Sequence, residues 1–214
     1  LLTINLPPNI TASTGIDAMV HAIEAYTSIN PNNNPISKML SIEALKVLGS
    51  SIKTAVFEGH NINARSNMLF GSMLAGKAFA NSPVAAVHAL AYPIGGLFNI
   101  SHGLSNSLVL PSVMKFNSIN DETKKYYANL APYVFKDLDN SKSDEIVCNN
   151  FIDSLESLSK ELKLPYRLRD LEIPEEACQL MASEAMKQTR LLVNNPRKIE
   201  ESDAFNICLL YTSP

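Results

Sequence analysis

Apolar residues recur at the spacing of an amphipathic helix from the first segment of the chain onward. Between Thr14 and Tyr26, one apolar stripe consists of Ile16, Met19, Val20 and Ile23. An adjoining stripe, about 100° further round the same predicted helix, consists of Asp17, His21 and Glu24. One side of this helix is therefore predicted to pack in the core, while the other is free for chemistry.

Turn residues divide the following pattern into further helices. The run from Ile29 to Ile36 is a predicted loop, and Asn34-Pro35 near its end is an expected N-cap and first helical residue. The helix that starts there should extend to about Phe57. A second helix, near residues 62–80, is rich in small residues that allow close packing: Gly71, Ser72, Ala75, Gly76 and Ala78.

Two histidines fall in the next pair of predicted helices. Ser82-Pro83 is expected to start the helix that carries His88, and Gly95-Gly96 to end it. His102 stands at the beginning of the following helix, which Pro111 should bend or interrupt.

Three more helices are predicted near residues 121–133, 143–163 and 175–190. Pro174 should begin the last, with Glu175 and Glu176 in its first turn. Leu1–Leu6 is a short extended candidate that resembles an entry segment. The sequence therefore predicts an all-α domain of eight to ten helices over residues 1–209, and residues 210–214 are interpreted as a possible truncation tail.

The composition is that of one well-buried globular domain, with 214 residues, 18% charged and 46% apolar. The net charge of −3, without a basic block, argues against nucleic acid as a partner. No stretch reaches the roughly 18 uninterrupted apolar residues of a membrane helix, and the N-terminus lacks the pattern of a secretory leader. We therefore expect a cytoplasmic protein that acts on a small molecule, not at a membrane.

The three cysteines, Cys148, Cys178 and Cys208, lie thirty residues apart in unlike surroundings, so their spacing indicates no repeat. None forms the closely spaced pair of a zinc site. Three free thiols in a reducing compartment are expected.

Metal-ligand chemistry is concentrated in two short segments. Asp17 and His21 are four residues apart on one helix, so both side chains can reach a common point. His88 and His102 are fourteen residues apart across a Pro-Ile-Gly-Gly break, which lets two consecutive helices each bring an imidazole to the same site. One carboxylate and three imidazoles could hold a first-row divalent ion and leave room for a substrate oxygen. On spacing alone, a hydrogen-bonded core histidine and an ordinary Asp–His helix contact explain the pattern equally well.

Three segments resemble a known family: LTINLPPNITASTGIDAMVHAIEAY, AGKAFANSPVAAVHALAYPIGGLFNISHGLSNSLVLPSVMKFN and LLVNNPR. They are similar to the C-terminal domain of the iron-containing (group III) alcohol dehydrogenases, over about residues 2–205. The resemblance implies the all-α, multi-helix half of a two-domain, dehydroquinate-synthase-like fold. It also implies that the metal ligands are Asp17, His21, His88 and His102. The implied metal is Fe²⁺, or Zn²⁺ as in some relatives.

A nicotinamide-binding glycine turn is not recognisable among the eight glycines, which include no G-x-G-x-x-G run. In the resembled family that turn belongs to an N-terminal α/β nucleotide-binding domain. The chain is therefore expected to be a fragment that lacks this domain, so that NAD or NADP is bound mainly elsewhere and the fragment alone is inactive. The resemblance further implies a small alcohol, aldehyde or hydroxyacid substrate and a full-length homo-oligomer.

Other polar residues are interpreted one by one. Tyr92, at a position where many members have a second histidine near the nicotinamide, is a candidate catalytic residue; a packing role has equal weight, and a phenol is a poorer proton shuttle than imidazole at neutral pH. Glu24 is expected to cap a helix or orient a ligand, in preference to being a fifth ligand. His60 is expected to be solvated, and Asn194–Arg197 to form a structural clamp.

Two other function classes stay open. A sugar-phosphate cyclase of the dehydroquinate-synthase type, which is a lyase, has a similar architecture with a metal in its helical half. A glutamate takes the carboxylate position there, so Asp17 points away from it. The second alternative is a non-catalytic helical module in which the histidines are core residues.

Overall fold

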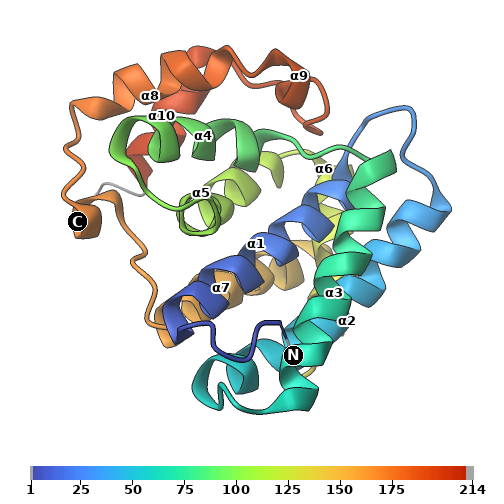
Figure 1. Cartoon of the computed structure of the whole chain (residues 1–214). Coiled ribbons are helices and arrows are strands. Elements are labelled where there is room, and N and C mark those ends of the chain that lie inside the picture. Colours follow the sequence, from blue (N-terminus) through green and yellow to red (C-terminus); the bar gives the residue numbers. More distant parts are fainter. Residues whose placement is uncertain (1, 211–214) are drawn as a thin grey trace.

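The structure is a computed structural model that describes residues 2–210, and over that part of the chain it is built of helices without a strand (Figure 1). The predicted all-α class is confirmed. The elements are α1 (Pro8–Thr27), α2 (Pro35–Phe57), α3 (Ile62–Asn81), α4 (Ala86–Phe98), α5 (His102–Asn117), α6 (Asp121–Val134), α7 (Asp144–Glu161), the 3₁₀ turn η1 (Leu168–Leu171), α8 (Ala177–Met186), α9 (Thr189–Leu192) and α10 (Glu201–Leu210).

Helix α1 runs through the middle of the molecule. It packs against α2 and α3 on one side and against α5 on another, with α7 behind it in the view of Figure 1. The predicted apolar stripe is confirmed, because each of its four members is at most 1% exposed: Ile16, Met19, Val20 and Ile23. Helix α1 therefore joins the α2–α3 pair to α5 within one hydrophobic core.

Helices α2 and α3 form a close pair beside α1. As predicted, Asn34 caps α2: its Oδ1 accepts hydrogen bonds from the backbone N–H groups of Ile36 and Ser37 at 2.9 and 3.1 Å. The prediction of close packing by small residues holds at Gly71, where a Cβ would lie 2.6 Å from Cγ of Leu48.

The predicted ends of α4 are wrong at both termini. The helix starts at Ala86 instead of Ser82-Pro83, because its first turn is fixed by Glu24 of α1, whose Oε1 accepts from the N–H of Val87 at 2.6 Å. Gly95 and Gly96 lie inside the helix, which ends at Phe98. Asn99 takes the left-handed conformation (φ 56°) that usually falls to a C-terminal glycine, and an asparagine tolerates it.

Helix α5 starts at His102 as predicted, but Pro111 lies inside it without ending it. Residues 2–5 form a turn in place of the extended segment, closed by a hydrogen bond from Leu6 N–H to the carbonyl of Thr3 at 3.1 Å.

The last third of the chain agrees with the predictions less well. Helices α6 and α7 lie where they were expected. Glu175 and Glu176 precede α8 in a turn instead of occupying its first turn. The predicted helix near 175–190 is interrupted, because α8 ends at Met186 and α9 begins at Thr189, and α10 was not predicted. Leu210 is the last residue of α10, while residues 211–214 of the expected tail lie outside the described part.

The three cysteines are buried, and no disulfide joins them in the described part of the chain, as expected. None of the described helices combines the length and the apolar composition that crossing a bilayer requires.

Candidate metal centre

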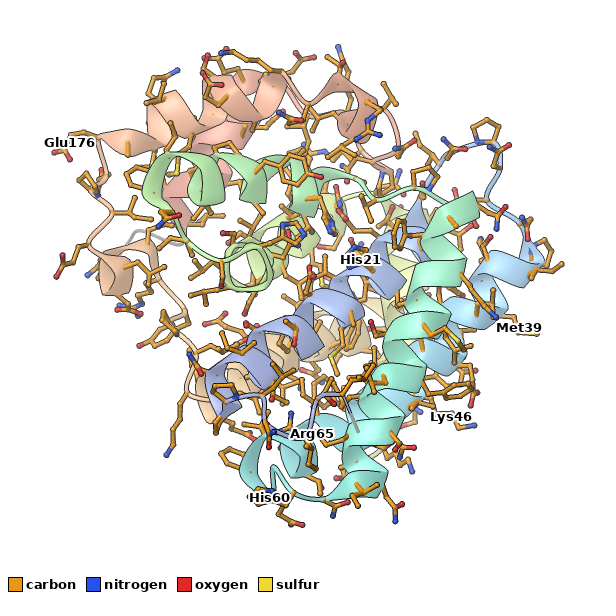
Figure 2. All side chains as sticks on the ribbon, viewed as in Figure 1. His21, Met39, Lys46, His60, Arg65 and Glu176 are labelled. Carbon is orange, nitrogen blue, oxygen red and sulfur yellow. The ribbon has the colours of Figure 1, made fainter. Side chains whose placement is uncertain are left out.

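The four predicted ligand side chains come together where α1, α4 and α5 meet. Donor atoms of Asp17, His21 and His88 lie within 4.8 Å of one another. His102, the first residue of α5, adds an Nε2 atom 3.6 Å from Oδ1 of Asp17. In Figure 2, His21 lies near the middle of the molecule, whereas His60 lies at its lower end. His60 is exposed and is not part of the cluster, as expected.

A glycine brings α5 close enough to α1 for this arrangement. A Cβ on Gly103 would lie 2.6 Å from the carbonyl oxygen of Ser13, a backbone atom that cannot move aside independently. Any larger residue would push the start of α5 away from α1. The neighbouring His102 therefore reaches Asp17 because residue 103 has no side chain.

His88 is the most deeply buried imidazole of the group, with 2% of its side chain exposed. Its Nδ1 lies 2.6 Å from Oε2 of Glu24. Its Nε2 is buried and has no hydrogen-bond partner among the described residues, and it points toward Oδ1 of Asp17 at 3.9 Å. An unpaired buried nitrogen of this kind is unfavourable by about 1–3 kcal/mol, so its presence calls for an explanation.

All three imidazoles are held in the same tautomer. Nδ1 of His21 donates to the backbone carbonyl of Asp17 at 2.8 Å, and Nδ1 of His88 donates to the Glu24 carboxylate. Nε2 of His102 accepts from the Asn106 side-chain amide at 3.1 Å, which leaves the proton on Nδ1. These assignments follow from partners that can only accept or only donate. In each ring, Nε2 is therefore the nitrogen with a lone pair to offer.

The environment of His21 also favours the form that binds a metal. Burial, and next the neighbouring His88, lower the pKa of His21, while Asp17 acts in the opposite direction. A neutral imidazole can coordinate a cation, whereas an imidazolium cannot.

The carboxylate of Asp17 lies at the centre of the cluster. Its Oδ1 is 3.7 Å from Nδ1 of His21, 3.9 Å from Nε2 of His88 and 3.6 Å from Nε2 of His102. These separations are too long for hydrogen bonds. Donors that share one first-row ion, each about 2.0–2.2 Å from it, lie roughly 3–4 Å apart. The distances to Nε2 of His88 and of His102 fall in this range, and a donor atom of His21 lies within 4.8 Å of those of Asp17 and His88. The residues present therefore fit a single divalent ion.

Glu24 behaves as a capping and orienting residue. Its Oε1 accepts from Val87 N–H and its Oε2 from His88, both at 2.6 Å. Because both oxygens are engaged in these bonds, the geometry gives no support to a fifth metal ligand at this position.

Tyr92 lies at the edge of the cluster. It follows His88 by four residues on α4, its ring centroid is 5.9 Å from that of His102, and it is 38% exposed. A phenol in this position can reach a molecule bound beside the imidazoles, and its exposure also permits a simple surface role.

The sequence interpretation missed Asn106. This residue is fully buried on α5, and its Nδ2 donates to Oδ1 of Asp17 at 2.5 Å. Asn106 follows His102 by four residues, so the spacing that links Asp17 to His21 was also available as a signal here.

The predicted clamp at Asn194–Arg197 is confirmed as structural. Asn194 donates to the carbonyl of Val84 at 3.0 Å, and Arg197 donates to that of Phe116 at 3.0 Å. The segment thus ties the connection before α4 to the end of α5.

Comparison with known proteins agrees with this geometry. The profile of the Fe-containing alcohol dehydrogenase family, C-terminal, matches residues 11–210. The chain is 40% identical to long-chain-alcohol dehydrogenase 1 of Geobacillus thermodenitrificans over 94% of its own length and 50% of that protein. It is 35% identical to 1,3-propanediol dehydrogenase of Citrobacter freundii over 97% of the chain and 52% of that protein.

Among solved structures, an alcohol dehydrogenase from Oenococcus oeni superposes with a TM-score of 0.92 at 34% identity, covering 98% of this chain and 53% of that one. The sulfoacetaldehyde reductase of Bifidobacterium kashiwanohense, solved with NAD⁺, superposes with a TM-score of 0.82 at 26% identity, covering 99% of this chain and 52% of that one. The chain thus spans about half the length of the relatives it matches.

Proposed function

We propose, because the chain belongs to the iron-containing alcohol dehydrogenase family, that Asp17, His21, His88 and His102 hold one divalent metal ion that serves hydride exchange between an alcohol and a nicotinamide. The observation that carries this proposal is the buried Nε2 of His88, which has no partner among the described residues and lies 3.9 Å from Oδ1 of Asp17. A cation at this point would be coordinated by that nitrogen and by the carboxylate of Asp17.

The donor set suits the chemistry. When bound, a divalent ion supplies Lewis acidity, which polarises a carbonyl oxygen or lowers the pKa of an alcohol. Asp17 contributes the one negative charge of the four donors, so a dication held here keeps a net positive charge toward substrate. Nitrogen and oxygen donors accept both Fe²⁺ and Zn²⁺. We propose Fe²⁺ as the metal because it is the metal of the family description, with Zn²⁺ as the alternative.

Tyr92 is our candidate for a catalytic residue of this chain. Its distance of 5.9 Å from the ring of His102 and its partial exposure support a phenol that donates a hydrogen bond to a bound substrate oxygen or takes part in a proton relay.

We further propose that the nicotinamide, NAD or NADP, is bound mainly by residues beyond these 214, which contain no recognisable phosphate-binding glycine turn. The names of the relatives, a long-chain-alcohol dehydrogenase, a 1,3-propanediol dehydrogenase and a sulfoacetaldehyde reductase, support an alcohol or aldehyde as substrate. That the substrate is small, or is a hydroxyacid, stays a prediction. A cytoplasmic location and a homo-oligomeric full-length enzyme stay predictions. The family assignment favours a dehydrogenase over a sugar-phosphate cyclase.

Metal analysis tests the proposal directly. The purified chain, saturated with Fe²⁺ without oxygen or with Zn²⁺ and then desalted, should retain one ion per chain by elemental analysis. A folded chain that retains neither ion would contradict the proposal and favour the non-catalytic helical module.

A further inference from the structure

Asn106 lies between two of the proposed metal ligands. It is fully buried on α5, and its single amide nitrogen is 2.5 Å from Oδ1 of Asp17 and 3.1 Å from Nε2 of His102. One side chain thus contacts a carboxylate of α1 and an imidazole of its own helix.

The orientation of this amide is dictated by its neighbours. An amide nitrogen can only donate and has two hydrogens, one for the carboxylate and one for the imidazole. The opposite orientation would bring two oxygens, the amide Oδ1 and the Asp17 Oδ1, to the same short distance. The Oδ1 of Asn106 is buried and has no hydrogen-bond partner among the described residues, which is unfavourable. This cost arises because the amide directs its N–H groups toward Asp17 and His102.

The contact with His102 has a consequence for metal binding. Because the amide donates, Nε2 of His102 carries a lone pair and the ring proton lies on Nδ1. His102 has 49% of its side chain exposed and therefore lacks the burial that holds His88 in place. In the structure, the Nε2 atom of His102 is hydrogen-bonded to the side chain of Asn106.

We propose that Asn106 is a positioning residue of the metal centre, a role that rests on the proposed metal site. It holds the Asp17 carboxylate in place through one N–H group. Through the other, it keeps Nε2 of His102 unprotonated and directed toward Asp17 until a metal ion takes that lone pair. The bond to Nε2 is given up when the ion binds, whereas the bond to the carboxylate can persist. Hydrogen-bond partners of a ligating carboxylate typically change metal affinity by about 10–100-fold when they are removed.

Two variants of Asn106 and one matched control test this role. Asn106→Leu replaces the amide by an apolar group of similar volume, and Asn106→Ala serves where Leu does not fold. Asn117 is also a buried asparagine of α5, paired with Asn195 at 2.8 and 3.0 Å, and lies about 16 Å further along the helix axis. Asn117→Leu therefore disturbs a buried amide pair of the same helix without touching the ligands.

Titration with Co²⁺ and Zn²⁺ should give affinities about 10–100-fold below wild type for the Asn106 variants. Asn117→Leu should melt at a lower temperature and keep its metal affinity. In the metal-free chain, ¹⁵N NMR of the imidazoles should show the Nδ1–H tautomer at His102 in wild type and a mixture of tautomers in Asn106→Ala, a change that a purely structural residue would not produce.

The outcomes separate this inference from the proposed function. A wild-type chain that binds no metal contradicts the proposed metal site. The His102 tautomer, compared between wild type and Asn106→Ala, then still shows whether Asn106 controls that tautomer. A wild-type chain that binds metal, together with Asn106 variants of unchanged affinity and unchanged His102 tautomer, overturns the inference alone.

Discussion

The Nδ1 atom of His88 lies 2.6 Å from Oε2 of Glu24, and both side chains are almost completely buried, with 2% and 5% exposed. The second oxygen of the same carboxylate accepts from the N–H of Val87 at 2.6 Å. One side chain of α1 therefore fixes the first turn of α4 and, within that turn, directs Nε2 of His88 toward Asp17. The fold and the proposed metal site depend on the same pair of bonds.

Glu24→Gln should weaken metal binding by about 10–100-fold and lower stability by about 1–3 kcal/mol. A glutamine has one acceptor oxygen, so it cannot accept from both Val87 and His88. If the oxygen stays with Val87, the amide donates to Nδ1 of His88 and moves the ring proton to Nε2, where it blocks coordination. Metal titration and thermal melting measure both effects. Glu43→Gln, an exposed change on α2, is the control. Equal metal affinity in the two variants would contradict the role of Glu24.

Replacing His88 and His102 together by alanine should abolish stoichiometric metal binding, because the change removes two of the four protein donors. Elemental analysis after desalting measures occupancy, and circular dichroism checks that the helices persist. Full metal content in the folded double variant would show that the ion is held elsewhere.

The features that sequence could predict are those with local causes. The buried stripe of α1 follows from residue spacing, and the start of α2 follows from an asparagine whose side chain bonds two residues directly after it. The proposed metal ligands were recognisable because Asp17 and His21 share a helix and because the motifs resemble a known family.

The features that sequence missed depend on distant contacts. Helix α4 starts at Ala86 because Glu24, 63 residues before Val87, accepts its N–H. The same helix continues past Gly95 and Gly96 to Phe98, because Asn99 adopts the left-handed conformation that ends it. Periodicity within one segment cannot reveal a partner on another helix. Asn106 is the exception, since its spacing from His102 was visible in the sequence, while its contact with Asp17 was not.

Gly103→Ala should destabilise the chain by about 1–3 kcal/mol and weaken metal binding, because the new Cβ would lie 2.6 Å from the carbonyl of Ser13 and move His102 away from Asp17. Gly96 is the matched control, since it also lies in a helix but a Cβ added there would have nothing within 4 Å. Gly96→Ala should stabilise the chain by about 0.5–1 kcal/mol and leave metal affinity unchanged. The prediction fails if the two variants melt alike.

Stability should fall on the alkaline side partly because of Cys148. Burial raises the pKa of this thiol from 9.0 to about 11. A group with a raised folded-state pKa contributes stability that is complete below its unfolded pKa and is lost as pH rises through the folded value. The loss should fall between pH 9 and 11 and amount to at most roughly 2–3 kcal/mol.

Cys148→Ala tests this assignment, with Val147→Ala as a control that removes buried volume next to it without removing a titrating group. Chemical unfolding at pH 8.5 and pH 10.5 should show a smaller loss of stability in Cys148→Ala than in Val147→Ala. Identical losses would assign the alkaline sensitivity to other groups.

The purified 214-residue chain should bind a metal ion and still show no dehydrogenase turnover. Hydride transfer requires a nicotinamide held roughly 3–3.5 Å from the carbinol carbon, a proximity that cofactor binding has to supply. The eight glycines of the chain include no G-x-G-x-x-G run that could hold the cofactor phosphates, which is why we propose that residues beyond these 214 bind them. NAD(P)H affinity should accordingly be negligible by fluorescence titration.

Joining the chain in cis to the N-terminal half of a relative of the same family should create both cofactor binding and alcohol-dependent NAD(P)⁺ reduction. The same fusion carrying His88→Ala and His102→Ala should bind the cofactor and remain inactive, because it has the nucleotide site without the metal. Alcohol-dependent NAD⁺ reduction by the 214-residue chain alone, above the level of its own His88→Ala, His102→Ala variant, would show that these residues already contain a complete active site.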